Sequence, residues 1–151
     1  MRSEDIKYVI IQAGGKGIRM GRYAENKPKC LVPVKGIPMI MNTIEKYKDK
    51  EIIIITDYKA DVLEAYLSNF CKYNFTVCQT TEQGTAGGLG KVVDSIPDDE
   101  PFILTWADLF FEETPKFEFD KDLLVGLSDT FKCRWKLENN KFENEASTET
   151  G

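Results

Sequence analysis

Short, nearly continuous apolar runs alternate with amphipathic stretches along this chain, and that alternation limits its possible folds more than any other feature. Four runs have the length and composition of strands buried on both faces: KYVIIQ (7–12), EIIIIT (51–56), FTVCQ (75–79) and PFILTWAD (101–108). Apolar residues at helical spacing lie between them, in PMIMNTIEKYK (38–48) and KADVLEAYLSNF (59–70). Strands that alternate with helices form a mostly parallel sheet. We therefore predict an α/β fold with a Rossmann-like, three-layer architecture.

The second half of the chain carries weaker signals. TAGGLGKVVDSI (85–96) predicts a helix, although its three glycines lower helix propensity. LLVGLS (123–128) and KCRWKLE (132–138) predict two further strands. The stretch from 138 to 151 is polar and poor in apolar residues, which predicts a loop or a frayed end. We expect one α/β domain over 1–137 and a polar tail over 138–151.

Composition excludes several classes of chemistry. The chain has 151 residues and no histidine, so neither Ser-His-Asp catalysis nor a histidine metal site is available. Its four cysteines show no CxxC spacing, and we interpret them as reduced thiols of a cytoplasmic protein without a zinc site. No apolar run approaches the ~20 residues of a membrane span. The net charge of −5 argues against a nucleic-acid partner.

Positive charge is concentrated in one segment. Residues 16–35 hold six cations and one acid, a net +5, whereas the other 131 residues hold 14 cations and 24 acids, a net −10. A basic segment in an acidic protein is typical of a local anion site. A solvated basic loop would have the same composition, so charge alone does not decide between the two.

The basic segment begins in a glycine loop, AGGKGIRMG (13–21), directly after the first predicted strand. Glycines let backbone N–H groups wrap an anion without obstruction by Cβ atoms, and Lys16 and Arg19 could neutralise its charge. The Rossmann pattern G-x-G-x-x-G fails because Met20 stands where its last glycine would be, and the P-loop pattern is also absent. The loop is therefore a phosphate loop of another kind or a plain turn.

Two more polar features follow predicted strands. QTTEQGTAGG (79–88) comes after the third strand, and Asp108 ends the fourth. In an open α/β sheet, ligands bind at the carboxyl ends of the strands. The coincidence of three such features at one sheet edge predicts a ligand site there.

The stretch VIIQAGGKGIRMGRYAENKPKCLVPVKGIPMI (9–40) closely resembles the opening signature of the sugar-phosphate nucleotidyltransferase family. That signature runs loosely L-A-G-G-x-G-T-R, a spacer, P-K-x-L-x-P-V, then G-x-P-M/L-I. Gln83-Gly84-Thr85-Ala86 resembles the second nucleotide-contacting loop of the family, and WAD (106–108) resembles the strand that ends in a metal-binding aspartate. The resemblance covers residues 7–110, with three motifs in the family's order.

This resemblance implies roles by position. Arg19, with Lys16, would grip the β- and γ-phosphates, Lys29 would contact the α-phosphate or the incoming phosphate, and Asp108 would hold Mg²⁺. Arg19 and Lys29 are thus the implied catalytic residues. The implied nucleotide-binding residues are Gln12, Ala13, Gly14, Gly15, Lys16, Gly17, Gln79, Gln83, Gly84 and Thr85.

The implied activity is transfer of a nucleoside monophosphate from a nucleoside triphosphate to a sugar 1-phosphate or another small phosphorylated acceptor, with release of pyrophosphate. Both reactants are anions, so such catalysis depends on charge neutralisation and positioning more than on a general base. We favour CTP, by likeness to cytidylyltransferases of capsule and polysaccharide biosynthesis. The expected partners are these two substrates, without nucleic acid or membrane, and a homo-oligomer stays open.

Two other functions stay open, a non-catalytic nucleotide-binding regulatory module and a molybdopterin-type guanylyltransferase. Single residues also have plainer interpretations, since Lys29 fits an ordinary loop and Asp108 fits a helix N-cap. Ile18 replaces the threonine usual before the loop arginine. Family members usually continue well beyond this length, so we expect the chain to be truncated on its C-terminal side.

Overall fold

The structure is a computed structural model that describes residues 1–81, 84–126, 135–139 and 141–144. It consists of two compact units, Met1–Glu118 and Phe119–Gly151. The domain boundary expected at residue 137 stays a prediction.

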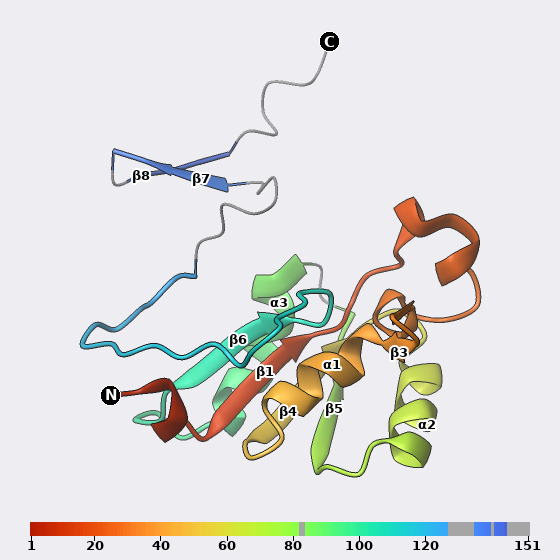
Figure 1. Ribbon diagram of the computed structural model, residues 1–151, viewed down its shortest axis with the longest axis horizontal. Helices are drawn as coiled ribbons and strands as arrows, with labels where there is room; N and C mark the ends of the chain where they lie inside the picture. The colour runs from red at the N-terminus through yellow and green to blue at the C-terminus, as the bar shows by residue number, and fades with distance from the viewer. Residues whose placement is uncertain (82–83, 127–134, 140, 145–151) are drawn as a thin grey trace. The chain divides into compact units, whose positions relative to one another are not determined.

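A four-stranded parallel sheet forms the centre of the first unit (Figure 1). Its spatial order is β5 (Phe75–Gln79), β4 (Glu51–Thr56), β1 (Tyr8–Gln12) and β6 (Phe102–Trp106). The register pairs Ile10 of β1 with Ile53 of β4 on one side and with Leu104 of β6 on the other. The α/β prediction is therefore confirmed, and all four predicted strands form this one sheet.

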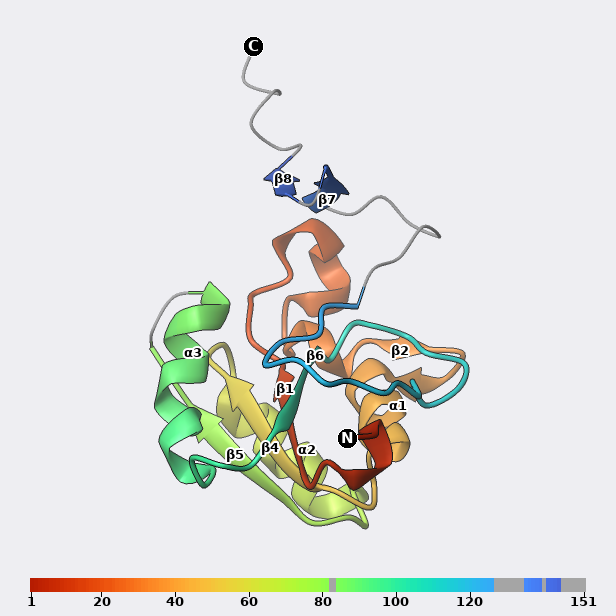
Figure 2. The same ribbon diagram turned by 90° about the vertical axis from the view of Figure 1, so that its left-hand side faces the viewer.

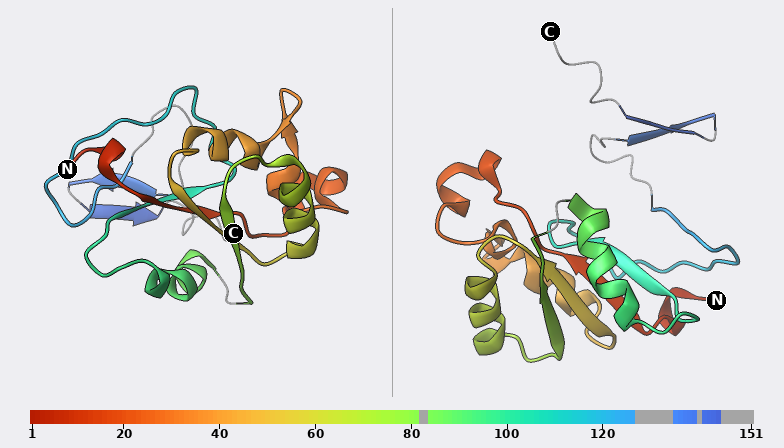
Figure 3. Two further views of the ribbon diagram at one scale, coloured as in Figure 1. Left: turned by 90° about the horizontal axis from the view of Figure 1, so that it is seen from below. Right: turned by 180° about the vertical axis from the view of Figure 1, so that it is seen from behind.

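Helices cover both faces of the sheet (Figures 2 and 3). The helices α1 (Met39–Lys46) and α2 (Ala60–Phe70) pack on one face, where the buried cluster includes Ile11, Ile54 and Leu63. The helix α3 (Gly84–Val92) and the 3₁₀ turn η4 (Val93–Ser95) lie on the opposite face. Successive side chains of a strand point to opposite faces, so uninterrupted isoleucine runs supply both clusters.

Several short elements between β1 and α1 were not predicted. The 3₁₀ helix η2 (Ile18–Ala24) begins inside the glycine loop, and η3 (Lys29–Leu31) follows it. The strands β2 (Pro33–Val34) and β3 (Ile37–Pro38) form a small hairpin that α1 follows directly. Its turn residues Lys35 and Gly36 have φ of 51° and 83°, as a tight two-residue hairpin turn requires.

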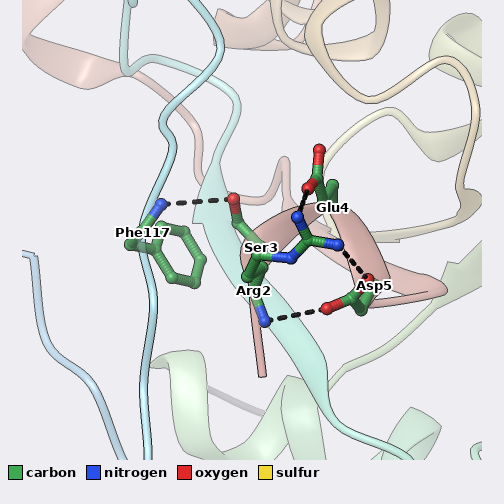
Figure 4. Close-up of polar contacts among 5 residues, drawn as sticks. All are labelled: Arg2, Ser3, Glu4, Asp5 and Phe117. Atoms are coloured by element: carbon green, nitrogen blue, oxygen red, sulfur yellow. Dashed lines mark hydrogen bonds and ion pairs between the residues drawn. The ribbon is translucent and has the colours of Figure 1, made fainter.

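The N-terminal segment is held against residues just before the end of the first unit (Figure 4). In η1 (Ser3–Asp5), the backbone N–H of Ser3 donates to the Phe117 carbonyl at 2.8 Å, and the Phe117 N–H donates back to Ser3 Oγ at 3.2 Å. The Arg2 N–H donates to the carboxylate of Asp5, which lowers the pKa of that side chain. Residues far apart in sequence thereby close this unit.

The second unit contains an antiparallel hairpin of β7 (Trp135–Glu138) and β8 (Lys141–Asn144). The strand predicted over 132–138 overlaps β7, but β8 lies in the expected polar tail, so that part of the tail was predicted wrongly. Asn139 has a φ of 49°, which suits a tight turn. The strand expected over 123–128 is also wrong where it is described, since residues 123–126 pair with no strand and Leu123 is 77% exposed. Residues 127 and 128 lie outside the described residues.

No helix within the described ranges is long and apolar enough to cross a membrane.

Candidate functional site

A cavity of about 240 Å³ opens at the carboxyl ends of β1, β4 and β6. The chain proceeds from β1 towards β4 on one side and returns to β6 on the other, so the strand order reverses here, and ligands of open α/β sheets bind at such a point. Its walls come from five segments, the start of the glycine loop, the η3 region and the ends of β4, β5 and β6. The lining residues are Gln12, Ala13, Gly14, Gly15, Lys29, Cys30, Ile55, Thr56, Asp57, Thr80, Trp106, Ala107 and Asp108.

The glycine loop turns sharply at the mouth of this cavity. Gly15 has a φ of 101° and Gly17 a φ of 61°, and side chains rarely adopt either value. The backbone N–H of Gly15 donates to Asp57 Oδ1 at 2.7 Å. A Cβ atom on Gly14 would lie 3.1 Å from the same oxygen. The two glycines thus allow a carboxylate to lie directly against the loop backbone.

Lys29 and Asp108 both line the cavity and form an ion pair. Lys29 begins η3 directly after Pro28, and Asp108 follows β6. Lys29 Nζ lies 2.5 Å from Asp108 Oδ2, with the two side chains 33% and 39% exposed. Two residues 79 positions apart in sequence therefore form one charged pair that remains accessible from the cavity.

The corner between β4 and α2 contacts the glycine loop at Gly15 and the end of η2 at Glu25. Asp57 accepts the Gly15 N–H at the start of the loop. Tyr58 Oη and Lys59 Nζ both donate to the Glu25 carbonyl, at 3.3 and 3.0 Å. The corner therefore fixes the loop relative to the end of β4.

The helix α3 approaches the sheet closely beneath the cavity. Gly88 is buried, and a Cβ atom there would lie 2.8 Å from Ile55 Cγ2 and 3.4 Å from Gln12 Nε2. Both of those residues line the cavity. The glycines that weakened the helix prediction thus include one that this packing requires.

The structure brings together only part of the set that the sequence predicted. Six of the predicted residues line the cavity: Gln12, Ala13, Gly14, Gly15, Lys29 and Asp108. Lys16, Gly17, Arg19 and Gln79 are not among its lining residues, and the side chains of Lys16 and Arg19 are exposed. Gln83 lies outside the described residues, and Gly84 and Thr85 form the start of α3. The functional roles of all these residues remain predictions.

The plainer interpretation of Asp108 as a helix N-cap does not hold. Residues 107 and 108 form a turn, and no helix starts in the residues described immediately after them. Trp106, two residues before Asp108, is 42% exposed and lines the cavity.

Asp57 is a cavity residue that sequence reasoning did not identify, and Thr80 lies in the stretch 79–88 but was not singled out. Both directly follow a predicted strand, and the same rule that singled out Asp108 would have found them. Cys30 is another, and its burial raises the pKa of its thiol to about 12. This thiol is therefore protonated at neutral pH and is a poor nucleophile.

The donor set in the cavity suits a metal ion shared with a bound phosphate better than a site formed by protein alone. Within the described ranges, no group of three or more Asp, Glu, Cys or His side chains is placed to hold a metal ion. Two carboxylates, Asp57 and Asp108, line the cavity. Mg²⁺ in nucleotide enzymes commonly takes one or two carboxylates and completes its shell with phosphate oxygens and water. The residues present fit Mg²⁺ in that manner.

The chain is similar to known proteins in sequence and in fold. The MobA-like NTP transferase domain family matches residues 9–115. The bifunctional protein GlmU of Methanocaldococcus jannaschii is 34% identical over 108 residues, which is 69% of this chain and 25% of that protein. Glucose-1-phosphate cytidylyltransferase of Salmonella typhimurium is 27% identical over 126 residues, 66% of this chain and 49% of that protein. The chain thus spans from a quarter to a half of the length of these relatives.

Solved structures with a similar fold include CTP:phosphocholine cytidylyltransferase (LicC) from Streptococcus pneumoniae, with a TM-score of 0.61 and 26% identity over 72% of this chain and 48% of that one. HddC from Yersinia pseudotuberculosis complexed with GMP-PN has a TM-score of 0.60 and 25% identity, over 70% of this chain and 49% of that one. The relatives' names confirm the predicted sugar-phosphate nucleotidyltransferase resemblance. With the family match over most of its length, the chain belongs to the MobA-like NTP transferase domain family.

Proposed function

We propose that this chain binds a nucleoside triphosphate in the cavity at the ends of β1, β4 and β6 and forms the nucleotide-binding part of a nucleotidyltransferase. The reaction transfers a nucleoside monophosphate to a sugar 1-phosphate or another small phosphorylated acceptor and releases pyrophosphate. The observation that carries this proposal is the placement of the glycine-loop backbone and the Lys29–Asp108 pair around one cavity.

Lys29 and the glycine-loop backbone have different roles in this proposal. The Lys29 ammonium group stabilises negative charge on the phosphate that undergoes substitution, because a cation near the reacting phosphorus reduces the repulsion between two anions. The glycine-loop backbone offers N–H donors to phosphate oxygens. No general base is needed at the acceptor, since its phosphate oxygen is already ionised.

We propose Mg²⁺ as the cofactor, held by Asp108 and by oxygens of the bound triphosphate. When bound, the ion neutralises phosphate charge. Lys29 pairs with Asp108 in this structure, and with Mg²⁺ on that carboxylate the ammonium group would be available to pair with phosphate.

For the substrates, we propose CTP and an acceptor that is small and phosphorylated. Two relatives support CTP, since one is named as a glucose-1-phosphate cytidylyltransferase and another as a CTP:phosphocholine cytidylyltransferase. A relative named as a mannose-1-phosphate guanylyltransferase and the HddC complex with GMP-PN make GTP the competing choice. At about 240 Å³ the cavity is smaller than the ~300 Å³ lower end for small-molecule sites, so part of a nucleotide would project from its mouth.

A thermal-unfolding screen tests binding first. The chain is heated with ATP, CTP, GTP, UTP or dTTP, with and without Mg²⁺. A ligand that binds only the folded state at 100-fold excess over its Kd stabilises by about 2.7 kcal/mol, and we expect the largest shift for CTP with Mg²⁺. Equal melting temperatures with every nucleotide would contradict nucleotide binding.

Pyrophosphate release from CTP and a panel of phosphorylated acceptors then tests turnover. The variant Asp108→Asn keeps the shape of the side chain and removes its charge, so we expect it to lose Mg²⁺-dependent stabilisation and turnover. Glu112→Gln, an exposed change that lies outside the cavity lining, is the matched control. Unchanged turnover in Asp108→Asn would contradict the metal assignment.

A further inference from the structure

Two groups in the cavity that suit an anion are each bonded to a carboxylate of the chain. The Gly15 N–H donates to Asp57 Oδ1 at 2.7 Å, and Lys29 Nζ pairs with Asp108 Oδ2 at 2.5 Å. A phosphate that uses the Gly15 amide therefore meets a carboxylate already in place.

The fit between Asp57 and the loop is close. The Asp57 side chain lies directly against Gly14. A Cβ atom on Gly14 would lie 3.1 Å from Oδ1 and 3.3 Å from Cγ of Asp57. Gly15, whose N–H donates to the same oxygen, has a φ of 101°, a value that favours glycine. Glycine at position 14 thus leaves room for one anionic group against the backbone, and Asp57 fills it.

We propose that Asp57 is an internal anion that occupies the Gly15 amide in the ligand-free protein and is displaced when a polyphosphate binds. This inference rests on the proposed function. It adds Asp57 as a residue that lowers nucleotide affinity by competing with the phosphate. One N–H group makes one good hydrogen bond, so the carboxylate and a phosphate oxygen compete for it.

Local geometry makes the exchange feasible. Asp57 is an exposed residue at the cavity rim, so its side chain can turn to water without the cost of burying a charge. Its Oδ1 also accepts the N–H of Tyr58 at 2.5 Å, a bond that belongs to the corner and not to the loop. After release, Asp57 retains this local partner and stays close enough to return when the ligand leaves.

The exchange predicts the direction in which polyphosphate affinity changes when the charge of Asp57 is removed. In the wild type, a polyphosphate must break the Gly15–Asp57 bond and then remain near a like charge. The substitution Asp57→Asn keeps the shape and an oxygen acceptor but removes the negative charge, which weakens the bond to Gly15 and ends the repulsion. The repulsion between two like unit charges ~4 Å apart in a water-like medium changes an equilibrium constant about fivefold. We therefore expect Asp57→Asn to bind a polyphosphate about fivefold more tightly than the wild type does.

The experiment titrates tripolyphosphate and CTP, each with EDTA to remove metal, into the wild type, Asp57→Asn and Asp57→Ser, and follows the Gly15 amide resonance by NMR. Glu64→Gln on α2 is the control, because it removes an equal charge from an exposed side chain outside the cavity lining. We expect the Gly15 resonance of the wild type to move during titration, both Asp57 variants to bind more tightly, and Glu64→Gln to match the wild type. The thermal melting of each variant confirms that it is folded.

Opposite results would overturn the inference. If the wild type binds and folded Asp57 variants bind equally or more weakly, Asp57 supports the loop or is irrelevant, and only this inference fails. A Gly15 resonance that stays unmoved while the wild type binds has the same meaning. If neither the wild type nor the variants bind tripolyphosphate or CTP, and the nucleotide screen with Mg²⁺ is also negative, the proposed function fails and the inference fails with it.

Discussion

Replacement of Gly88 by alanine tests whether α3 must approach the sheet as closely as the structure places it. A Cβ atom at residue 88 would lie 2.8 Å from Ile55 Cγ2, whereas carbon atoms in contact are normally ~3.5–4.0 Å apart. Ile55 is only 1% exposed and branched at Cβ, so it cannot move aside easily. Either the helix shifts outwards or the core is overpacked, at a cost of about 1–3 kcal/mol.

Gly90 provides a matched control in the same helix. A Cβ atom at that position meets no atom within 4 Å. Both substitutions gain the same helix propensity, up to ~1 kcal/mol. Gly90→Ala should therefore be more stable than the wild type. The free energy of unfolding should be about 1–3 kcal/mol lower for Gly88→Ala than for Gly90→Ala, because only the overpacking cost differs between them.

Chemical denaturation and thermal melting of the two variants measure this difference, at ~4 °C per kcal/mol for a domain of this size. The reasoning also predicts a functional difference. The added methyl group lies 3.4 Å from Gln12 Nε2, and Gln12 lines the cavity, so Gly88→Ala should weaken nucleotide binding whereas Gly90→Ala should not. A Gly88→Ala protein as stable as Gly90→Ala, with unchanged binding, would refute the close approach of α3.

Three further predictions concern the site. Lys29→Met should weaken binding of a triphosphate at least tenfold, because it removes the ammonium group that pairs with Asp108 and that we propose for the phosphate. Calorimetry measures the affinity, and equal affinity of variant and wild type would contradict a role of Lys29 in phosphate binding. The free energy of unfolding should fall as pH rises above about 9, by up to ~1.4 kcal/mol per unit, because Cys30 releases its proton near 9 when unfolded but has a pKa of about 12 when folded. Denaturant titrations of Cys30→Ala should show this slope reduced, and an identical slope would contradict the burial of the thiol. Gly17→Ala should destabilise more than Gly21→Ala, since both have positive φ but only the Cβ atom at residue 17 would be crowded, 3.0 Å from Lys29 Cβ; equal melting temperatures would contradict that crowding.

Local patterns were sufficient where one element buries its own periodic face. The isoleucine runs of β1 and β4 and the apolar spacing of α2 could be read as strands and a helix, because burial on both faces or on one face leaves a direct trace in sequence. The failures concern elements decided by pairing. The exposed residues 123–126 have apolar composition without a strand partner, and β8 is polar but has β7 beside it.

By itself, the sequence determined the layered α/β architecture, the family, and the edge of the sheet that carries the site. It did so because strand burial, glycine spacing and polar residues at strand ends are local properties of the chain. Only the tertiary structure decided which of those residues meet. Lys29 reaches Asp108 and Gly15 reaches Asp57 through the order of the strands, whereas Lys16 and Arg19, in the same loop, point to water. The residues of these two pairs are separated by 79 and 42 positions in the sequence, respectively. Such contacts depend on the packing of whole strands, and no local pattern contains that information.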